Sequence, residues 1–269
     1  MRAKQGSIAI ALLILTLAGA ASAFVFRVQI RDLVFKYTQE PIPKAVTPPR
    51  RPESPTVTPP RSRSEPRGGA GEAHEIPPPL LPLEFNLAVP FTPQAPHANW
   101  DQPYQDGCEE AAALMVHFFY TNRTFTPDIA DDAILAAVAF EDRRFGFNKD
   151  TNAEQTATFI RELYGYKNVD VVYDITVDDV KRTIASGFPV IVPAYGRALG
   201  NPFFTPPGPE YHMLVIKGYT RDKFITNDPG TRRGADFLYP YETLLSAVHD
   251  WNGGDVQNGR KVMIVVKPN

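Results

Sequence analysis

The sequence predicts an α+β fold in which a helical first half packs on an antiparallel sheet. Between residues 106 and 165 the apolar residues recur at helical spacing. After Gly165 apolar and polar residues instead alternate, as they do in strands. Two of these later segments are joined by a short polar turn, which is typical of a hairpin. Helices that precede an antiparallel sheet form segregated layers.

The helical half contains three predicted helices, each with a polar start and an apolar stripe. They cover residues 106–120, 128–142 and 152–165. The second half contains alternating or buried apolar segments and one short helix that Gly187 closes. The predicted strands are 168–175, 188–196, 212–220, 223–230 and 261–268, and the short helix covers 176–187.

Residues 1–26 form an export signal or a membrane anchor rather than part of a domain. A positive start, "MRAK", precedes the apolar run "IAIALLILTLAGAA", and "ASA" ending at Ala23 has the small-x-small form of an export cleavage site. The apolar run continues to Phe26, so the segment is just long enough to span a membrane if it is retained. We therefore expect an exported protein at the cell surface or outside the cell, and both outcomes of cleavage stay open.

Residues 27–83 are a predicted linker. Residues 41–82 hold 13 of the 27 prolines, and almost no apolar periodicity interrupts them. Such a segment cannot bury enough apolar surface to offset its ordering entropy, so we expect a disordered, semi-rigid spacer. Residues 27–67 carry nine basic and four acidic residues, whereas the domain at 84–269 is acidic. An acidic domain argues against a nucleic-acid partner.

The predicted domain contains the single cysteine of the chain, Cys108. Asp106 is a good N-cap and Glu109 completes a capping-box pattern, which would make Cys108 the second residue of a helix. The positive end of a helix lowers the pKa of a thiol, whereas the carboxylates of Glu109 and Glu110 oppose a thiolate. A lone cysteine can also be a small buried apolar residue, so the thiol needs a base to be interpreted as a nucleophile.

Of the five histidines, His212 is the best candidate for that base. It opens a predicted strand after a long Gly/Pro loop, and Asp228 follows near the end of the next strand. A hairpin turn centred on Thr220 would set these two side chains opposite each other on one face of the sheet. A turn centred on "RD" would offset them by three residues. Under the first register Asp228 orients the imidazole, with Asn227 as the second choice.

Four sequence blocks resemble cysteine-peptidase family thirty-nine, the bacteriocin-processing, double-glycine peptidases, and their free-standing relatives. The blocks are "LAVPFTPQ", "DGCEEAAALM", "YHMLVIKGYT" and "FITNDPG". The resemblance covers nearly all of residues 86–269 and implies a papain-like cysteine peptidase fold. It also implies that Cys108 is the nucleophile, His212 the base, Asp228 the orienting group and Gln94 the oxyanion-hole glutamine.

The chain departs from that pattern at two places. Glu109 stands where the family commonly has glycine, and an insertion separates Gln94 from Cys108 by 14 residues. Gln102 is therefore a rival for the oxyanion role, and Trp100 and Tyr211 are candidates for contacting substrate. No Walker-type motif accompanies the domain, so we do not expect an exporter.

The predicted function is an exported thiol hydrolase that cleaves peptide bonds through an acyl-enzyme. A cell-wall amidase or transpeptidase of the same fold and a non-catalytic peptide-binding module are the alternatives. The partner is a peptide or protein substrate, and the membrane is a second partner only if the N-terminal segment is retained. The single cysteine and scattered histidines lack metal-ligand spacing, so we expect no metal and no cofactor. No feature of the sequence indicates an oligomeric state.

Overall fold

The computed structural model describes residues 26–27, 29–30, 33–35, 39–48 and 81–269. The chain divides into two compact units, Met1–Ile42 and Pro43–Asn269. The predicted export segment up to residue 25 and most of the predicted linker, residues 49–80, lie outside the described residues. In the described part of the chain, no helix combines the length and apolar character needed to cross a membrane.

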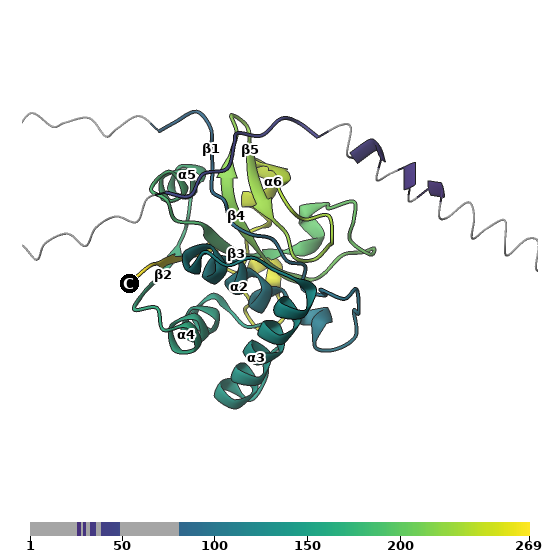
Figure 1. The fold of residues 1–269 in the computed structure, drawn as a ribbon, viewed down its shortest axis with the longest axis vertical. Helices are drawn as coiled ribbons and strands as arrows, with labels where there is room; N and C mark the ends of the chain where they lie inside the picture. The colour runs from purple at the N-terminus through teal and green to yellow at the C-terminus, as the bar shows by residue number, and fades with distance from the viewer. Residues whose placement is uncertain (1–25, 28, 31–32, 36–38, 49–80) are drawn as a thin grey trace, which may run out of the picture. The chain divides into compact units, whose positions relative to one another are not determined.

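After a short strand, β1 (Phe85–Asn86), the second unit continues with helices and then with the rest of its sheet, as Figure 1 shows. Asn152 and Thr176 cap two helices with capping boxes, which explains why polar residues mark these starts. Helix α2 is buried almost all round, as expected of a helix at the centre of a domain. The helices are α2 (Cys108–Thr121), α3 (Pro127–Phe145), α4 (Ala153–Tyr164), α5 (Val177–Ala185) and α6 (Tyr241–Ala247), with 3-10 turns η1 (Tyr104–Asp106), η2 (Gly196–Leu199) and η3 (Val256–Asn258).

The strands form one seven-stranded sheet with the order β2-β7-β3-β4-β5-β6, and β1 pairs with β4 outside this path. Every pair of named strands is antiparallel. The predicted α+β class, with helices packed on an antiparallel sheet, is confirmed. The strands are β1 (Phe85–Asn86), β2 (Asn168–Tyr173), β3 (Val190–Tyr195), β4 (Tyr211–Tyr219), β5 (Lys223–Asn227), β6 (Phe237–Pro240) and β7 (Val262–Lys267).

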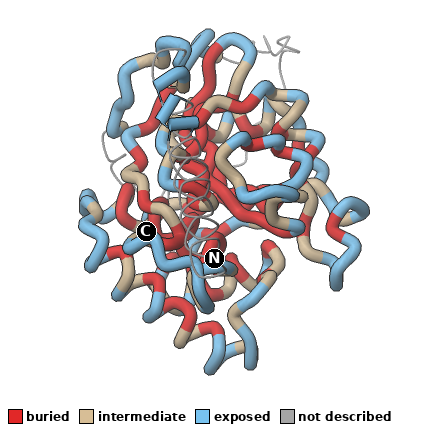
Figure 2. The backbone as a smooth tube through the Cα atoms, turned by 90° about the vertical axis from the view of Figure 1, so that its right-hand side faces the viewer, coloured by how far each residue is buried: buried red, intermediate tan, exposed pale blue. Residues whose placement is uncertain are grey.

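Strand β4 is the centre of the core. All nine of its residues are buried, and it contacts α2, α5 and the neighbouring strands β3 and β5. Figure 2 shows this concentration of buried backbone along the strands in the middle of the domain. The sequence did not predict β6 or α6. Strand β6 is only four residues long, and α6 follows Pro240 without a side-chain cap, so both lack the usual start signals.

Part of the segment that the sequence assigned to the linker pairs with the domain. Val46 forms a parallel bridge with Leu87, in which Val46 N–H donates to Asn86 O and Ala88 N–H donates to Val46 O, both at 2.9 Å. Asn86 Nδ2 also donates to Pro43 O at 2.9 Å. Residues 43–46 thus contact the domain that the sequence predicts from residue 84, although they lie in the predicted linker.

We expect the bridge at Val46 to stabilise the domain. Val46→Pro removes the N–H that donates to Asn86 O, so the free energy of unfolding should fall by about 1–2 kcal/mol. Ala45→Pro is the matched control, because the Ala45 N–H has no backbone acceptor among the described residues. Urea unfolding of the two variants measures the effect, and an equal loss in both would show that the bridge contributes nothing specific.

Candidate active site

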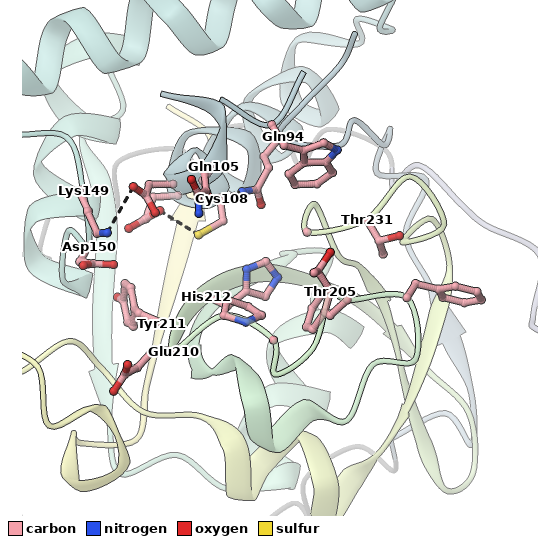
Figure 3. Close-up of a pocket in the computed structure, with 18 of the residues that line it drawn as sticks. Gln94, Gln105, Cys108, Lys149, Asp150, Thr205, Glu210, Tyr211, His212 and Thr231 are labelled. Atoms are coloured by element: carbon pink, nitrogen blue, oxygen red, sulfur yellow. Dashed lines mark hydrogen bonds and ion pairs between the residues drawn. The ribbon is translucent and has the colours of Figure 1, made fainter. Parts of the chain in front are cut away.

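A cleft of about 790 Å³ brings together residues from both halves of the domain. Cys108 lines it from the start of α2, and Tyr211 and His212 line it from the start of β4. Gln94 and Trp100, from the loop before η1, line it as well. Figure 3 shows the sulfur of Cys108 and the ring of His212 facing the same space. Segments more than 100 residues apart thus meet in one cavity.

Helix α2 begins one residue later than the sequence predicted. Gly107 is the N-cap, without a side-chain hydrogen bond, and Cys108 is the first helical residue rather than the second. The predicted capping box at Asp106 is therefore wrong. Asp106 ends η1, and its carboxylate instead accepts from Gln102 Nε2 at 2.7 Å and pairs with Lys149 at 3.5 Å. The thiol still lies at the positive end of the helix dipole.

The thiol of Cys108 is buried, and its sulfur lies at hydrogen-bond distance from Glu109 Oε2, 2.9 Å away. The other oxygen of that carboxyl group, Oε1, accepts from Thr151 N–H at 3.1 Å. Burial, followed by the charge and hydrogen bond of Glu109, raises the pKa of Cys108 well above its ordinary value. Glu109 thus adds to the effect of burial on the thiol from the next position along the helix.

Glu109 belongs to a group of three buried carboxyls, with Glu110 on α2 and Glu141 on α3. Burial is the largest cause of the raised pKa in all three groups, and each also lies near another carboxylate. The pKa of Glu141 rises to about 8. Thr151 contacts two of these acids: its Oγ1 lies 3.4 Å from Glu141 Oε1, and its backbone N–H donates to Glu109 Oε1.

His212 and Asp228 form a buried pair, with 2.8 Å between Nε2 and Oδ1. Burial alone would raise the pKa of Asp228, but the charge of His212 and the hydrogen bonds to the carboxylate hold that pKa below its ordinary value. An ionised Asp228 fixes the proton of the imidazole on Nε2, which leaves Nδ1 as the nitrogen that can accept another proton. The pair therefore has the arrangement of a general base and its orienting carboxylate.

A β-bulge sets the register of this pair. Tyr219 faces Phe224, which centres the turn on Arg221 and Asp222 rather than on Thr220. Without an irregularity this turn would offset His212 and Asp228 by three residues, onto opposite faces. The register shifts between Ile216 and Gly218, so that Val215 faces Asn227.

This shift changes the offset from three residues to two, which returns both side chains to one face. Asn227, the second choice for the orienting residue, points elsewhere: its Nδ2 donates to Val89 O at 3.1 Å and Pro90 O at 3.2 Å. The inserted residue is Lys217, whose C=O accepts from Leu87 N–H and whose ammonium pairs with Asp236.

Three further residues hold Asp228, and the sequence analysis did not identify them. Tyr239 OH donates to Oδ2 at 2.6 Å, Asn201 Nδ2 donates to Oδ2 at 3.1 Å, and Gly230 N–H donates to Oδ1 at 3.0 Å. A Cβ on Gly230 would come within 2.9 Å of the His212 ring, so only glycine fits beside it. The "NDPG" motif could have indicated Gly230, whereas Tyr239 lies on the strand that was not predicted.

The structure distinguishes the two candidate oxyanion glutamines by position. Gln94 is buried in the cleft, and its Nε2 donates to Tyr104 O and Gln105 O, both at 2.9 Å. It thereby braces the 3-10 turn that leads into Cys108. Gln102 is exposed, bonds to Asp106, and does not line the cleft in the described part of the chain. Of the two candidates, Gln94 is the one that lines the cleft together with Cys108.

The two aromatic candidates for substrate contact lie differently. Trp100 lines the cleft with 39% of its surface exposed, so its ring can meet a ligand. Tyr211 is buried, and its OH donates to Thr151 O at 3.0 Å, which ties β4 to the loop behind Glu109. Phe204 packs edge-on against His212, with 5.3 Å between ring centroids, and limits the motion of the imidazole.

Metal-binding groups of three or more acidic, histidine or cysteine side chains do not occur among the described residues.

Comparison with known proteins identifies the family of the chain. Residues 86–252 match the model of the Peptidase_C39 like family. Among solved structures, a Bacillus anthracis protein assigned to the C39-like peptidases is 16% identical, with a TM-score of 0.44 over 68% of this chain and 96% of that chain. No curated protein matches.

The buried acids predict that the domain loses stability as pH rises. The pKa of Glu141 is about 8 in the fold against 4.5 ordinarily, so between these values the folded protein keeps a proton that the unfolded chain releases. The contribution of this proton to the free energy of unfolding should therefore be fully present below pH 4.5 and fall by on the order of 4 kcal/mol as pH rises to 8.

Urea unfolding across this pH range measures the slope. Glu141→Gln, which cannot ionise, should flatten it, whereas the exposed Glu154→Gln should keep it. An unchanged slope in Glu141→Gln would contradict the assignment of this proton to Glu141.

Proposed function

Because the chain belongs to the Peptidase_C39 like family, we propose that it is a thiol hydrolase that cleaves peptide bonds through Cys108, His212 and Asp228. The observation that carries this proposal is the buried His212–Asp228 pair at 2.8 Å, which faces the cleft that Cys108 also lines. A carboxylate, an imidazole and a thiol in this order are the groups that covalent acyl transfer requires.

In the proposed reaction His212 Nδ1 takes the thiol proton, and the sulfur keeps the electron pair and attacks the peptide carbonyl carbon. The C–N bond then breaks, and the imidazolium returns its proton to the leaving amine. Water, deprotonated by the same imidazole, releases the acyl group from the sulfur. If a donor amine took the place of water, the same intermediate would give transpeptidation, and product analysis with an added amine distinguishes the two outcomes.

The negative charge on the carbonyl oxygen needs donors at the start of α2. The first helical hydrogen bond is Ala111 N–H to Gly107 O, so the N–H of Cys108 has no acceptor within the helix. This N–H and one amide hydrogen of Gln94 are the proposed oxyanion donors. Gln94 would have to turn that hydrogen away from the Tyr104 or Gln105 carbonyl that it contacts.

One observation favours a second candidate, a peptide-binding module without catalysis. An ionised Glu109 would accept the thiol proton across the 2.9 Å contact, and burial together with Glu109 raises the pKa of Cys108. Such a thiol would be a poor nucleophile, and the cleft would then serve recognition alone.

The reactivity of the thiol decides between these functions. We expect Cys108→Ala to abolish peptide cleavage and His212→Ala to lower turnover by about 100-fold or more, because the base is lost. In the wild type, iodoacetamide should alkylate Cys108 near neutral pH, and His212→Ala should lose this reactivity.

Circular dichroism of both variants provides the control for folding. A wild-type thiol that is inert at neutral pH, with unchanged peptide binding in Cys108→Ala, would identify the chain as a binding module.

Export is a separate proposal, and the apolar segment after "MRAK" supports it. Cleavage after Ala23 would release a protein whose first residue is Phe24. We expect mass spectrometry of the N-terminal peptide from secreted and membrane fractions to find Phe24 if the segment is a signal. A chain that keeps residues 1–23 in the membrane fraction would instead identify an anchor.

A further inference from the structure

The proposed peptidase must form a thiolate beside Glu109, and the geometry around Glu109 indicates how. This carboxyl group is 1% exposed and has two contacts in opposite directions. Thr151 N–H donates to Oε1 at 3.1 Å, and Oε2 lies 2.9 Å from the Cys108 sulfur. Because Oε1 accepts a backbone hydrogen, Oε2 is the oxygen on which an acid proton would face the sulfur.

The described residues supply no cation that pairs with the buried acids at this site. Lys149 is a lining residue of the cleft, but its ammonium pairs with Asp106. Within the part of the chain that the structure describes, no lysine, arginine or histidine forms an ion pair with Glu109, Glu110 or Glu141. Three buried carboxylates without a cation would cost several kcal/mol each, so such groups take up protons instead.

On the basis of the proposed function, we propose that Glu109 is a neutral carboxylic acid whose Oε2–H donates to the Cys108 sulfur. The thiol proton is then free to move to His212. The direction of this one hydrogen bond determines the chemistry. An ionised Glu109 would accept the thiol proton and turn it away from His212. A neutral Glu109 donates instead, and the S–H bond is free to point toward the imidazole.

The proton transfer balances with groups that are all present. The S–H bond of Cys108 breaks, and its proton moves to Nδ1 of His212, which becomes an imidazolium next to the ionised Asp228. The sulfur keeps the electron pair. Its negative charge then accepts the hydrogen bond from Glu109 Oε2–H, and a charge-assisted bond of this kind is stronger than one to a neutral thiol.

The other titratable groups around Glu109 favour its neutral form. Glu110 lies on the same helix, Glu141 on α3, Asp150 on the loop before α4, and Tyr211 on β4. Burial and then the charge of Glu110 raise the pKa of Glu109 well above its ordinary value. At high pH Glu109 loses its proton and opposes the thiolate, so the reactivity of Cys108 should decline on the alkaline side.

Infrared difference spectroscopy reads the protonation of Glu109 without any need for catalysis. The spectrum of wild type minus Glu109→Gln at neutral pH should contain the C=O stretch of a protonated carboxylic acid. A carboxylate band in its place would overturn the proposal. Because this measurement does not depend on turnover, it separates a failure of this inference from a failure of the peptidase proposal.

The rate of Cys108 alkylation against pH tests the direction of the hydrogen bond. In Glu109→Gln an amide N–H, a weaker donor, replaces the acid, so the rate should fall by about threefold and lose its alkaline decline. Glu109→Ala has no donor and should fall by about tenfold or more. A rate that rises in Glu109→Gln would show that Glu109 is an ionised suppressor of the thiol.

Glu110→Gln is the matched control, since it makes the same change one residue along α2. Glu110 lies against Glu141 and has no hydrogen bond to the sulfur, and its charge affects the Cys108 pKa less than Glu109 does. This variant should therefore lose an acid band in the infrared but keep the neutral-pH alkylation rate. Equal losses of rate in Glu110→Gln and Glu109→Gln would contradict a specific bond from Glu109 to the sulfur.

Discussion

The buried hydrogen bond between His212 and Asp228 is the interaction on which the rest of the site depends. A carboxylate that is fully removed from water stays ionised only if donors replace its hydration. Asp228 has four such donors, two on each oxygen: the His212 ring and Gly230 N–H on Oδ1, and Asn201 and Tyr239 on Oδ2. They come from β4, β6 and two loops, so the charge of one side chain requires much of the sheet half to be folded around it.

The helical side of the cleft has the opposite electrostatics. Three acids, Glu109, Glu110 and Glu141, are as deeply buried there as Asp228. No cation among the described residues pairs with them, and burial raises the pKa of each. Burial therefore has two outcomes within one site: donors keep one carboxylate ionised, while their absence favours a proton on the others. In the proposed reaction, a neutral Glu109 leaves the proton of the Cys108 thiol free to move to His212.

Several features were predictable from the sequence because they depend on local patterns. Alternation and helical spacing identified the main helices and strands, and the capped starts at Asn152 and Thr176 follow from side chains within one turn of their helices. Their positions at a predicted helix start and near predicted strand ends identified Cys108, His212 and Asp228 as candidates. The short strand β6 and the capless helix α6 lacked such local signals.

The pairing of these residues needed the tertiary structure. The sequence by itself determined an α+β chain with a lone thiol at a helix start and an imidazole and a carboxylate on consecutive strands. Only the fold decided that Lys217 forms a bulge, which returns His212 and Asp228 to one face, because a one-residue shift of register depends on how β4 packs between its neighbours. Only the fold likewise decided the contact of Glu109 with the sulfur, since Thr151, which orients that carboxyl group, comes from a loop 42 residues away in the chain.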